Sequence, residues 1–554
     1  MFSTFIDKSS DPVKFKEWEP KIENYRNKLK ENTKKEWEVS SSHLPSDPDK
    51  TPFNAIEALL KVVDKSVLDI ISQPAHKLAE KLCTGKLTAF DTFVAFAKVA
   101  TIANQYTNYA MEFFVDEGLK RAEELDVYFR KHGKPVGPLH GLPISLKEHY
   151  NMKNKVTHAS YVSLIENVTD TDAVTIQNLY DAGAVFYVRT SGPQSLMHID
   201  SWNNITGRAR NPHNLMLGPG GSSSGEGAVV AMMGSSMGVG SDIGGSIRAP
   251  AGFCGVWGLR PTQKRISMKN TLGAFKGFEA VVCVIGPLAR YAEDIDLWMK
   301  SIIGQKPWLL DCNVVQVPWR TIEKPSPSSL KIGIIYDDGV VKPHPPIERG
   351  LNYMKKVLSE AGIEVVTVKP PRVAEAVETI NKLYSSDSGK CQLDLLEKSG
   401  EPLFPLTKWT LGFGKGTELM TAGEYRDLTD TRESIKEEYF NLMNDQGISF
   451  FISPVYNGVA PMPSTIKYWG YTALWNLIDM PNLVFPTGLF QDPKIDLVDS
   501  SYTPRSEIEK YEYGLYDDPS KFVGAPISLQ LTGRRYNDEE VVKCGELISD
   551  LLSK

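Results

Sequence analysis

Short apolar segments bounded by glycine and proline alternate with helical segments from about residue 135 onward, and this alternation constrains the fold more than any other feature. Pro143 to Leu146 and Ala184 to Val188 are two such segments, and Asp172 to Ala182 between them has a helical pattern. The alternation returns later in the segments 331–336, 364–369, 450–453 and 526–532, before a closing helix from about 538. Strands that alternate with helices favour a mostly parallel sheet covered by helices. We therefore predict an α/β fold.

The first 130 residues lack this alternation and are predicted to be helical. Trp18, Ile22, Tyr25 and Leu29 recur at helical spacing among lysines and glutamates, and Thr88 stands where an N-cap would open another helix. Charged residues are spread along this part as on a solvated face. We interpret residues 1–130 as a helical cover and residues 131–554 as the main domain.

The charge balance excludes one class of function. Lys and Arg number 62 and Asp and Glu 68, which gives a formal charge of −6 and a pI near 6.0. Proteins that bind nucleic acid as their main activity carry a basic excess. No nucleic-acid partner is therefore expected.

The cysteines and the hydropathy pattern bear on location. No CxxC motif or Cys/His cluster is present, so we expect reduced, buried thiols and neither disulfides nor a zinc site. The N-terminus has no secretory signal, and no apolar run is long enough for a transmembrane anchor. A cytoplasmic location is the resulting expectation. The six cysteines are Cys83, Cys254, Cys283, Cys312, Cys391 and Cys544.

Glycine and serine are concentrated between Pro219 and Thr262, where ionisable side chains are almost confined to four positions. Consecutive glycines let the backbone approach a ligand closely and turn several N–H groups toward one point. Such a backbone could bind a phosphate or an oxyanion. The four ionisable residues are Glu226, Asp242, Arg248 and Arg260.

Two interpretations of this segment meet difficulties. A phosphate-binding P-loop needs a Lys followed by Ser or Thr after its glycines, and neither glycine cluster has one. The run Gly221 to Gly225 satisfies GxSxG, the nucleophile elbow of α/β-hydrolases, but an elbow needs a later histidine as base. His344 is the only histidine after residue 213, and prolines surround it. An esterase is therefore kept only as an alternative.

A lysine is another candidate for the base. Lys147 ends the apolar run that starts at Leu142. A lysine desolvated enough to be neutral can accept a proton from a serine. The end of a strand is also an ordinary place for a surface lysine whose stem packs on apolar groups. These residues alone leave both interpretations open.

Several separated motifs share a pattern: GLPISLK at 141–147, GGSS at 220–223, GGSIR at 244–248, GLRPT at 258–262, GPLAR at 286–290 and PISLQL at 526–531. Together they closely resemble the amidase signature family, and especially its fungal acetamidases, with fatty acid amide hydrolase somewhat further off. The resemblance covers most of 135–300 and returns from about 450 to 545, with a less similar inserted section at about 305–445. It implies an α/β/α sandwich around a large mixed sheet.

The resemblance also implies a Ser–Ser–Lys triad. By motif, Ser246 is the nucleophile, Ser222 the bridging serine after a cis peptide bond, and Lys147 the base. No metal and no organic cofactor are implied. The oxyanion hole is assigned to the N–H groups of Ile243, Gly244, Gly245 and Ser246.

Other residues of these motifs are expected to support the site. Asp242 and Arg248 flank the nucleophile and are predicted to form an ion pair that pins its loop. Ser223 is expected to hydrogen-bond within the site. His149 and His198 lie near the motifs, and we interpret both as incidental.

The predicted function is hydrolysis of a carboxylic amide to the carboxylate and ammonia or an amine through an acyl-enzyme. Small to medium amides such as acetamide are expected, because the N-terminal helix is rich in Lys and Glu and offers no apolar entrance. The alternatives are fatty acid amide hydrolase-like activity, an amidotransferase subunit acting on charged tRNA, and the GxSxG esterase. The expected partner is a small-molecule amide substrate, and a homodimer is left open.

Overall fold

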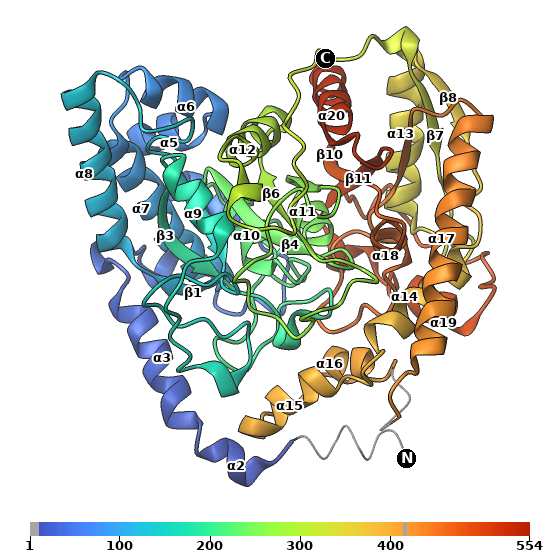
Figure 1. Cartoon of the computed structure of the whole chain (residues 1–554), viewed down its shortest axis with the longest axis horizontal. Coiled ribbons are helices and arrows are strands. Elements are labelled where there is room, and N and C mark those ends of the chain that lie inside the picture. Colours follow the sequence, from blue (N-terminus) through green and yellow to red (C-terminus); the bar gives the residue numbers. More distant parts are fainter. Residues whose placement is uncertain (1–9, 414–417) are drawn as a thin grey trace.

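A single mixed sheet of eleven strands organises the computed structural model, which describes residues 10–413 and 418–554 (Figure 1). The strand order is β1-β3-β2-β4-β6-β5-β10-β11-β9-β7-β8. The strands are β1 (Ala110–Phe113), β2 (Pro143–Lys147), β3 (Val185–Thr190), β4 (Met237–Asp242), β5 (Trp257–Arg260), β6 (Val284–Ala289), β7 (Lys331–Ile334), β8 (Glu364–Thr367), β9 (Phe450–Pro454), β10 (Asn482–Phe490) and β11 (Pro526–Thr532).

Both halves of the sheet contain parallel pairs, and antiparallel strands join them. β2 runs parallel to β3 and β4, and β7 runs parallel to β8 and β9. The strands from β4 through β6, β5, β10 and β11 to β9 pair antiparallel. Every apolar segment predicted as a strand forms one. The strands β4, β5, β6 and β10 were not predicted, because glycine or proline inside them lowers their intrinsic strand preference.

Helices connect and cover these strands. The helices of eight or more residues are α3 (Glu19–Glu31), α4 (Ala55–Val62), α6 (Ala75–Cys83), α7 (Ala89–Thr107), α8 (Val115–His132), α9 (Val174–Asp181), α10 (Ser224–Ala231), α12 (Ala292–Gly304), α13 (Pro345–Glu360), α14 (Val373–Tyr384), α15 (Lys390–Ser399), α17 (Ala422–Asp445), α18 (Gly470–Leu477) and α20 (Asp538–Leu552). Shorter ones are α2 (Pro12–Lys16), α5 (Lys65–Ile71), α11 (Arg248–Cys254), α16 (Pro405–Leu411) and α19 (Glu507–Tyr513).

The helices form a layer on each face of the sheet. Neighbouring residues of a strand point to opposite faces. In β5, a Cβ placed on Gly258 would lie 2.6 Å from Ala251 of α11, whereas the Trp257 ring lies beside Gly545 of α20. α11 and α20 therefore cover opposite faces, which gives the predicted three-layer arrangement.

The N-terminal part is helical apart from one strand. Ile22 is buried in α3, and Thr88 caps α7 by accepting the Asp91 N–H at 3.0 Å. β1 also lies in this part and pairs antiparallel with β3 at the edge of the sheet. The strand was missed because four residues are too few to show a strand period. The first 130 residues thus contribute to the sheet as well as covering it.

The section from 305 to 445 also joins the main sheet. Its strands β7 and β8 extend the sheet beyond β9, and α14 packs on α18 and α17. No helix of the described residues is both long and apolar enough to cross a membrane.

The cysteines correct one expectation. All six are free, but only Cys254 and Cys544 are buried. Cys312 and Cys391 are exposed, and Cys83 and Cys283 are half-buried. The expectation of buried thiols was therefore wrong for four of them.

Candidate active site

A buried lysine contacts two serine hydroxyls at the end of β2, the third strand of the sheet. Lys147 is the last residue of β2, and its side chain is 1% exposed. Its Nζ donates to Ser222 Oγ at 2.8 Å and to Ser241 Oγ at 3.0 Å. Ser241 was not predicted, although it stands in the glycine- and serine-rich segment directly before Asp242. The structure thus joins two of the predicted triad residues by a direct contact.

Burial changes the acidity of this lysine. Desolvation lowers the pKa of Lys147 to about 7, although the nearby groups of Cys283, Asp242 and Glu226 act to raise it. An ordinary lysine has a pKa of about 10.4 and carries a proton throughout the neutral range. A substantial fraction of Lys147 is therefore neutral at pH 7 and can accept a proton.

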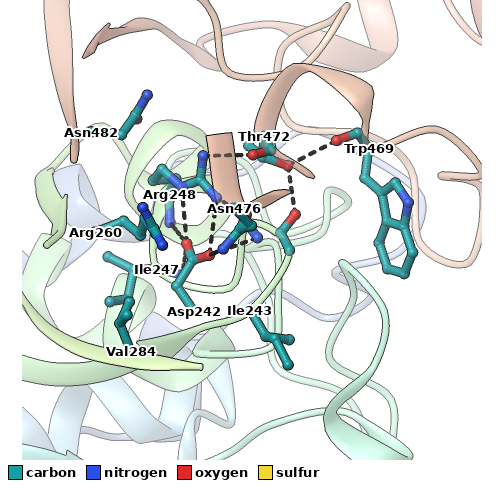
Figure 2. Close-up of polar contacts among 12 residues, drawn as sticks. Asp242, Ile243, Ile247, Arg248, Arg260, Val284, Trp469, Thr472, Asn476 and Asn482 are labelled. Carbon is teal, nitrogen blue, oxygen red and sulfur yellow. Dashed lines mark hydrogen bonds and ion pairs between the residues drawn. The ribbon is translucent and has the colours of Figure 1, made fainter. Parts of the chain in front are cut away.

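Ser246 lies in a turn between β4 and α11 that a buried carboxylate organises. Asp242 accepts the N–H groups of Gly245 at 2.9 Å and of Ile247 at 3.0 Å. Arg248 pairs with the same carboxylate, with its Nε at 3.0 Å and its Nη2 at 2.9 Å (Figure 2). Burial acts to raise the pKa of Asp242, but Arg248 and these hydrogen bonds hold it well below its usual range. Asp242 therefore stays ionised and fixes the backbone on both sides of Ser246.

Helix α18 supports the same turn through Thr472 and Asn476, as Figure 2 shows. Thr472 Oγ1 donates to the Gly244 carbonyl at 2.7 Å, and Asn476 Nδ2 donates to Asp242 at 2.9 Å. These two residues are four positions apart and so share one face of the helix. From α14, the buried Tyr384 hydroxyl donates to the Ile243 carbonyl.

None of these three supporting residues was predicted from the sequence. Thr472, Asn476 and Tyr384 lie outside the recognised motifs and far along the chain. The four-residue spacing of Thr472 and Asn476 was an available signal, because it places two polar side chains on one face of an otherwise apolar helix.

The hydrogen bonds distinguish the four N–H groups assigned to the oxyanion hole. The Gly245 N–H is occupied by Asp242. The N–H groups of Ile243, Gly244 and Ser246 have no acceptor among the described residues. Three of the four groups are therefore available to an oxyanion, and the fourth holds the turn.

The loop that carries Ser222 lies beside this turn. The Gly221–Ser222 peptide is cis. Ser223 Oγ donates to the Ser241 carbonyl at 3.3 Å and accepts the Ser241 N–H at 3.2 Å, so Ser223 bonds within the site. Ser222 and Ser246 line the same cavity, but no hydrogen bond joins their hydroxyls.

The arrangement disfavours the GxSxG elbow, whose nucleophile would be Ser223. No histidine contacts the Ser223 hydroxyl in the described part of the chain. His344 lies elsewhere, with its Nε2 3.1 Å from the Glu512 carbonyl. The esterase alternative therefore lacks its base.

A cavity of about 470 Å³ opens beside Ser222, Ser241 and Ser246. Pockets of about 300–1,000 Å³ accept drug-sized ligands, so this one is much larger than a two-carbon acyl group requires. Its wall is mainly apolar, and three lysines, one glutamate and one aspartate are among the other lining residues. The apolar members include Leu196, Met197, Ile266, Met268, Leu272, Phe275, Phe278 and Val314.

Two histidines were interpreted as incidental. His149 lines the cavity, its Nδ1 lies 3.1 Å from the Leu272 carbonyl, and burial lowers its pKa. Burial also lowers the pKa of His198 to about 3, and its Nε2 contacts Thr407 at 3.2 Å. Both are neutral at pH 7, and neither contacts the triad. The position of His149 in the cavity wall was not predicted.

No group of three or more His, Cys, Asp or Glu residues is placed to hold a metal ion within 10–413 and 418–554.

Known proteins resemble this chain over nearly its whole length. The family model described as Amidase matches residues 91–542. An acetamidase of Aspergillus oryzae is 34% identical over 547 residues, with 97% of this chain and 99% of that protein covered. An acetamidase of Emericella nidulans is 36% identical, with 97% and 98% covered. A solved structure of a fatty acid amide hydrolase superposes with a TM-score of 0.97 at 47% identity, covering 100% of this chain and 99% of that one.

These likenesses agree with a fold that places a buried lysine and a glycine-rich serine turn at the ends of β2 and β4 in a large mixed sheet, and they define an amide hydrolase. The family model spans more than half of the chain, and the acetamidases exceed 30% identity over nearly all of it. The chain therefore belongs to the amidase family.

Proposed function

We propose that this amidase hydrolyses carboxylic amides through an acyl-enzyme formed on Ser246, with Ser222 as the proton relay and Lys147 as the base. The observation that carries the proposal is the 2.8 Å contact between Lys147 Nζ and Ser222 Oγ in a fully buried setting. A neutral lysine there takes the Ser222 proton, and Ser222 in turn takes the proton of Ser246. The Ser246 oxygen then attacks the carbonyl carbon of the amide.

The attack places a negative charge on the former carbonyl oxygen. The free N–H groups of Ile243, Gly244 and Ser246 would receive that oxyanion. Losing one such donor costs about 2.7–4 kcal/mol of barrier. The relay then returns its proton to the leaving nitrogen, so ammonia or an amine departs and the acyl group stays on Ser246. Water hydrolyses the acyl-enzyme through the same residues.

Ser246→Ala tests the nucleophile. The variant should fold normally and release no ammonia from any amide, because the substitution removes the attacking oxygen and almost no packing. Ser301→Ala is the matched control, since the Ser301 hydroxyl is buried in α12 and donates only to the Leu297 carbonyl. Retention of more than a small residual rate by Ser246→Ala would refute the assignment.

The length of the acyl group is a separate question. The sequence predicts small to medium amides such as acetamide, and two relatives are named acetamidases. The second candidate is hydrolysis of fatty amides, which the 470 Å³ apolar cavity beside Ser246 favours. The likeness to a fatty acid amide hydrolase supports the same candidate.

A series of primary amides from acetamide to oleamide, assayed by ammonia release in detergent-free buffer, separates the two candidates. If the cavity holds the acyl chain, kcat/KM should rise with chain length, since each buried methylene contributes about 0.8 kcal/mol. A maximum at acetamide would support the small-amide prediction instead. Neither result would change the proposed triad.

A cytoplasmic location remains a prediction, and whether the chain forms a homodimer is still open. Cell fractionation would test the first, and sedimentation equilibrium of the purified chain would test the second.

A further inference from the structure

A second ionisable group is buried under Lys147. Glu226 lies in α10, which begins directly after Ser223, and its side chain is fully buried. Its Oε2 accepts the Ser145 hydroxyl at 2.6 Å and the Val239 N–H at 3.1 Å, and its Oε1 accepts the Thr190 hydroxyl at 2.7 Å. All three donors are neutral. In the described part of the chain, no Lys, Arg or His forms an ion pair with this carboxylate.

The sheet is shaped to admit the carboxylate. A Cβ on Gly238 of β4 would lie 2.1 Å from Glu226 Oε2, so any larger residue there would displace the carboxylate. Burying a carboxyl group without a cation is costly. The three hydrogen bonds and the absence of a side chain at Gly238 offset part of this cost.

The strand geometry places Glu226 next to the proposed base. Ser145 and Lys147 are two residues apart on β2, so they share one face and lie about 6.6 Å apart along the strand. Thr190 is the register partner of Lys147 on β3, and Gly238 is the partner of Ser145 on β4. The carboxylate therefore lies one pleat from the lysine, held by the strands on both sides of it.

We propose that Glu226 is a positioning residue whose negative charge, held under Lys147 by Ser145 and Thr190, sets the pH at which Lys147 becomes a base. The inference rests on the proposed function, because it concerns how the relay is tuned.

The other ionisable groups around Lys147 are either paired with an opposite charge or uncharged near pH 7. Asp242 is paired with Arg248. Burial raises the pKa of Cys283 to about 11, and burial lowers the pKa of His149, so both are uncharged near pH 7. Cys283 and Asp242 act more strongly on the pKa of Lys147 than Glu226 does, but of the two carboxylates among these groups only Glu226 has no cation paired with it.

The groups that face Glu226 are mostly neutral too. Besides Lys147, they are three buried tyrosines, whose pKa values burial raises far above neutral pH. Burial raises the pKa of Glu226 itself to about 7, against its hydrogen bonds and Lys147. Glu226 and Lys147 therefore titrate together as a coupled pair. The tyrosines are Tyr109, Tyr150 and Tyr187.

The direction of the effect follows from charge. An ionised Glu226 stabilises protonated Lys147 and raises its pKa, so removing the negative charge lets Lys147 lose its proton at lower pH. At an effective dielectric constant near 20, two unit charges several ångströms apart interact strongly enough to move a titration by about one to two pH units. Because Glu226 and Lys147 titrate together, the observed shift should lie nearer one pH unit than two.

Glu226→Gln tests the proposal. The glutamine carbonyl can accept from Ser145 and Val239, and its NH₂ can donate to the Thr190 hydroxyl, so the network is kept while the charge is lost. The readout is the rate at which a short alkyl fluorophosphonate inactivates the enzyme between pH 5 and 9. In that reaction the Ser246 oxygen bonds to phosphorus, fluoride leaves, and the serine proton passes to the relay. On the acid side of the plot of inactivation rate against pH, the midpoint should fall by about one pH unit in Glu226→Gln.

A matched control and a second variant complete the test. Glu401 is also a fully buried carboxylate held by neutral donors, and Glu401→Gln should leave the midpoint where it is in the parent. Thr190→Val removes one hydrogen bond that favours ionised Glu226, so it should move the midpoint the same way by a smaller amount. This variant decides the question if Glu226→Gln does not fold.

An unchanged midpoint in the folded Glu226→Gln enzyme, or in Thr190→Val if the glutamine variant does not fold, would overturn the inference and leave the triad intact. Failure of the fluorophosphonate to label Ser246 in the parent would refute both the inference and the proposed function.

Discussion

Replacing Asp242 by Asn should separate two effects: the contribution of Asp242 to the stability of the turn that holds Ser246 (residues 243–247, here called the nucleophile turn), and its contribution to the activity of the enzyme. The carboxylate accepts two backbone N–H groups of the turn and pairs with Arg248, and all of these groups are buried. Asn keeps one acceptor oxygen, but its NH₂ group would face other donors. The substitution also leaves the Arg248 guanidinium without its counter-charge.

The expected magnitude follows from this geometry and from the size of the chain. Breaking a buried ion pair by removing one partner costs about 3–5 kcal/mol. An unfolding entropy of about 2.1 cal/mol/K per residue, over 554 residues, converts this cost into a Tm decrease of roughly 3–4 °C. Because the folded pKa of Asp242 lies below its unfolded value, this stabilisation is fully present above about pH 4 and is lost as pH falls through the folded pKa.

The activity should fall by more than the stability loss explains. Loosening the turn misplaces the N–H groups beside Ser246, and one lost oxyanion donor lowers kcat by about 10²–10³. Calorimetry and amide hydrolysis at saturating substrate measure the two effects. Asp479→Asn is the control, because Asp479 pairs with the buried Arg260 but does not touch the turn. Equal Tm decreases with kcat retained within about threefold in both variants would refute the positioning role of Asp242.

Three further outcomes are expected. The kcat/KM of the parent enzyme should increase with pH through about 7, because Lys147 loses its proton there. Lys147→Ala should remove this pH dependence together with most of the activity. A flat kcat/KM profile of the parent from pH 6 to 9 would count against a lysine base. Gly245→Ala should destabilise the protein by about 1–3 kcal/mol and impair hydrolysis, because Gly245 has φ +133° and a Cβ there would lie 2.5 Å from Thr472; an unchanged Tm would contradict the strain. Thr472→Val should lower kcat with little change in KM, because it removes the hydrogen bond to the Gly244 carbonyl. Steady-state kinetics measures both constants, and a change in KM alone would contradict the prediction.

Local signals in the sequence predicted local structure well. The Thr88 cap, the strand from Pro526 to Thr532 and the helix from Asp538 all occur where turn chemistry and periodicity placed them. The strand β10 was missed because proline and glycine interrupt it, and its place between β5 and β11 depends on partners distant in sequence.

The candidate site shows the same contrast between features that local sequence predicts and features that depend on distant segments. Lys147, Ser222 and Ser246 could be named because each stands in a short motif. Tyr384 could not, because it contacts the backbone beside Ser246 only in the folded protein. For Thr472, the four-residue spacing to Asn476 marked a polar helix face, but not the residues that this face contacts. The hydrogen bond from the Gly245 N–H to Asp242 likewise depends on side-chain geometry.

The support of the nucleophile turn by α18 sets an order of events during synthesis. Gly244 precedes its partner Thr472 by 228 residues. A growing chain that has emerged only as far as β6 already contains both serines and the lysine, yet the hydroxyl and amide groups that hold the turn have not been made. The contacts that hold the turn around Ser246 are therefore complete only once the second half of the sheet has folded, so we expect a chain that ends before α18 to carry the motif without this support.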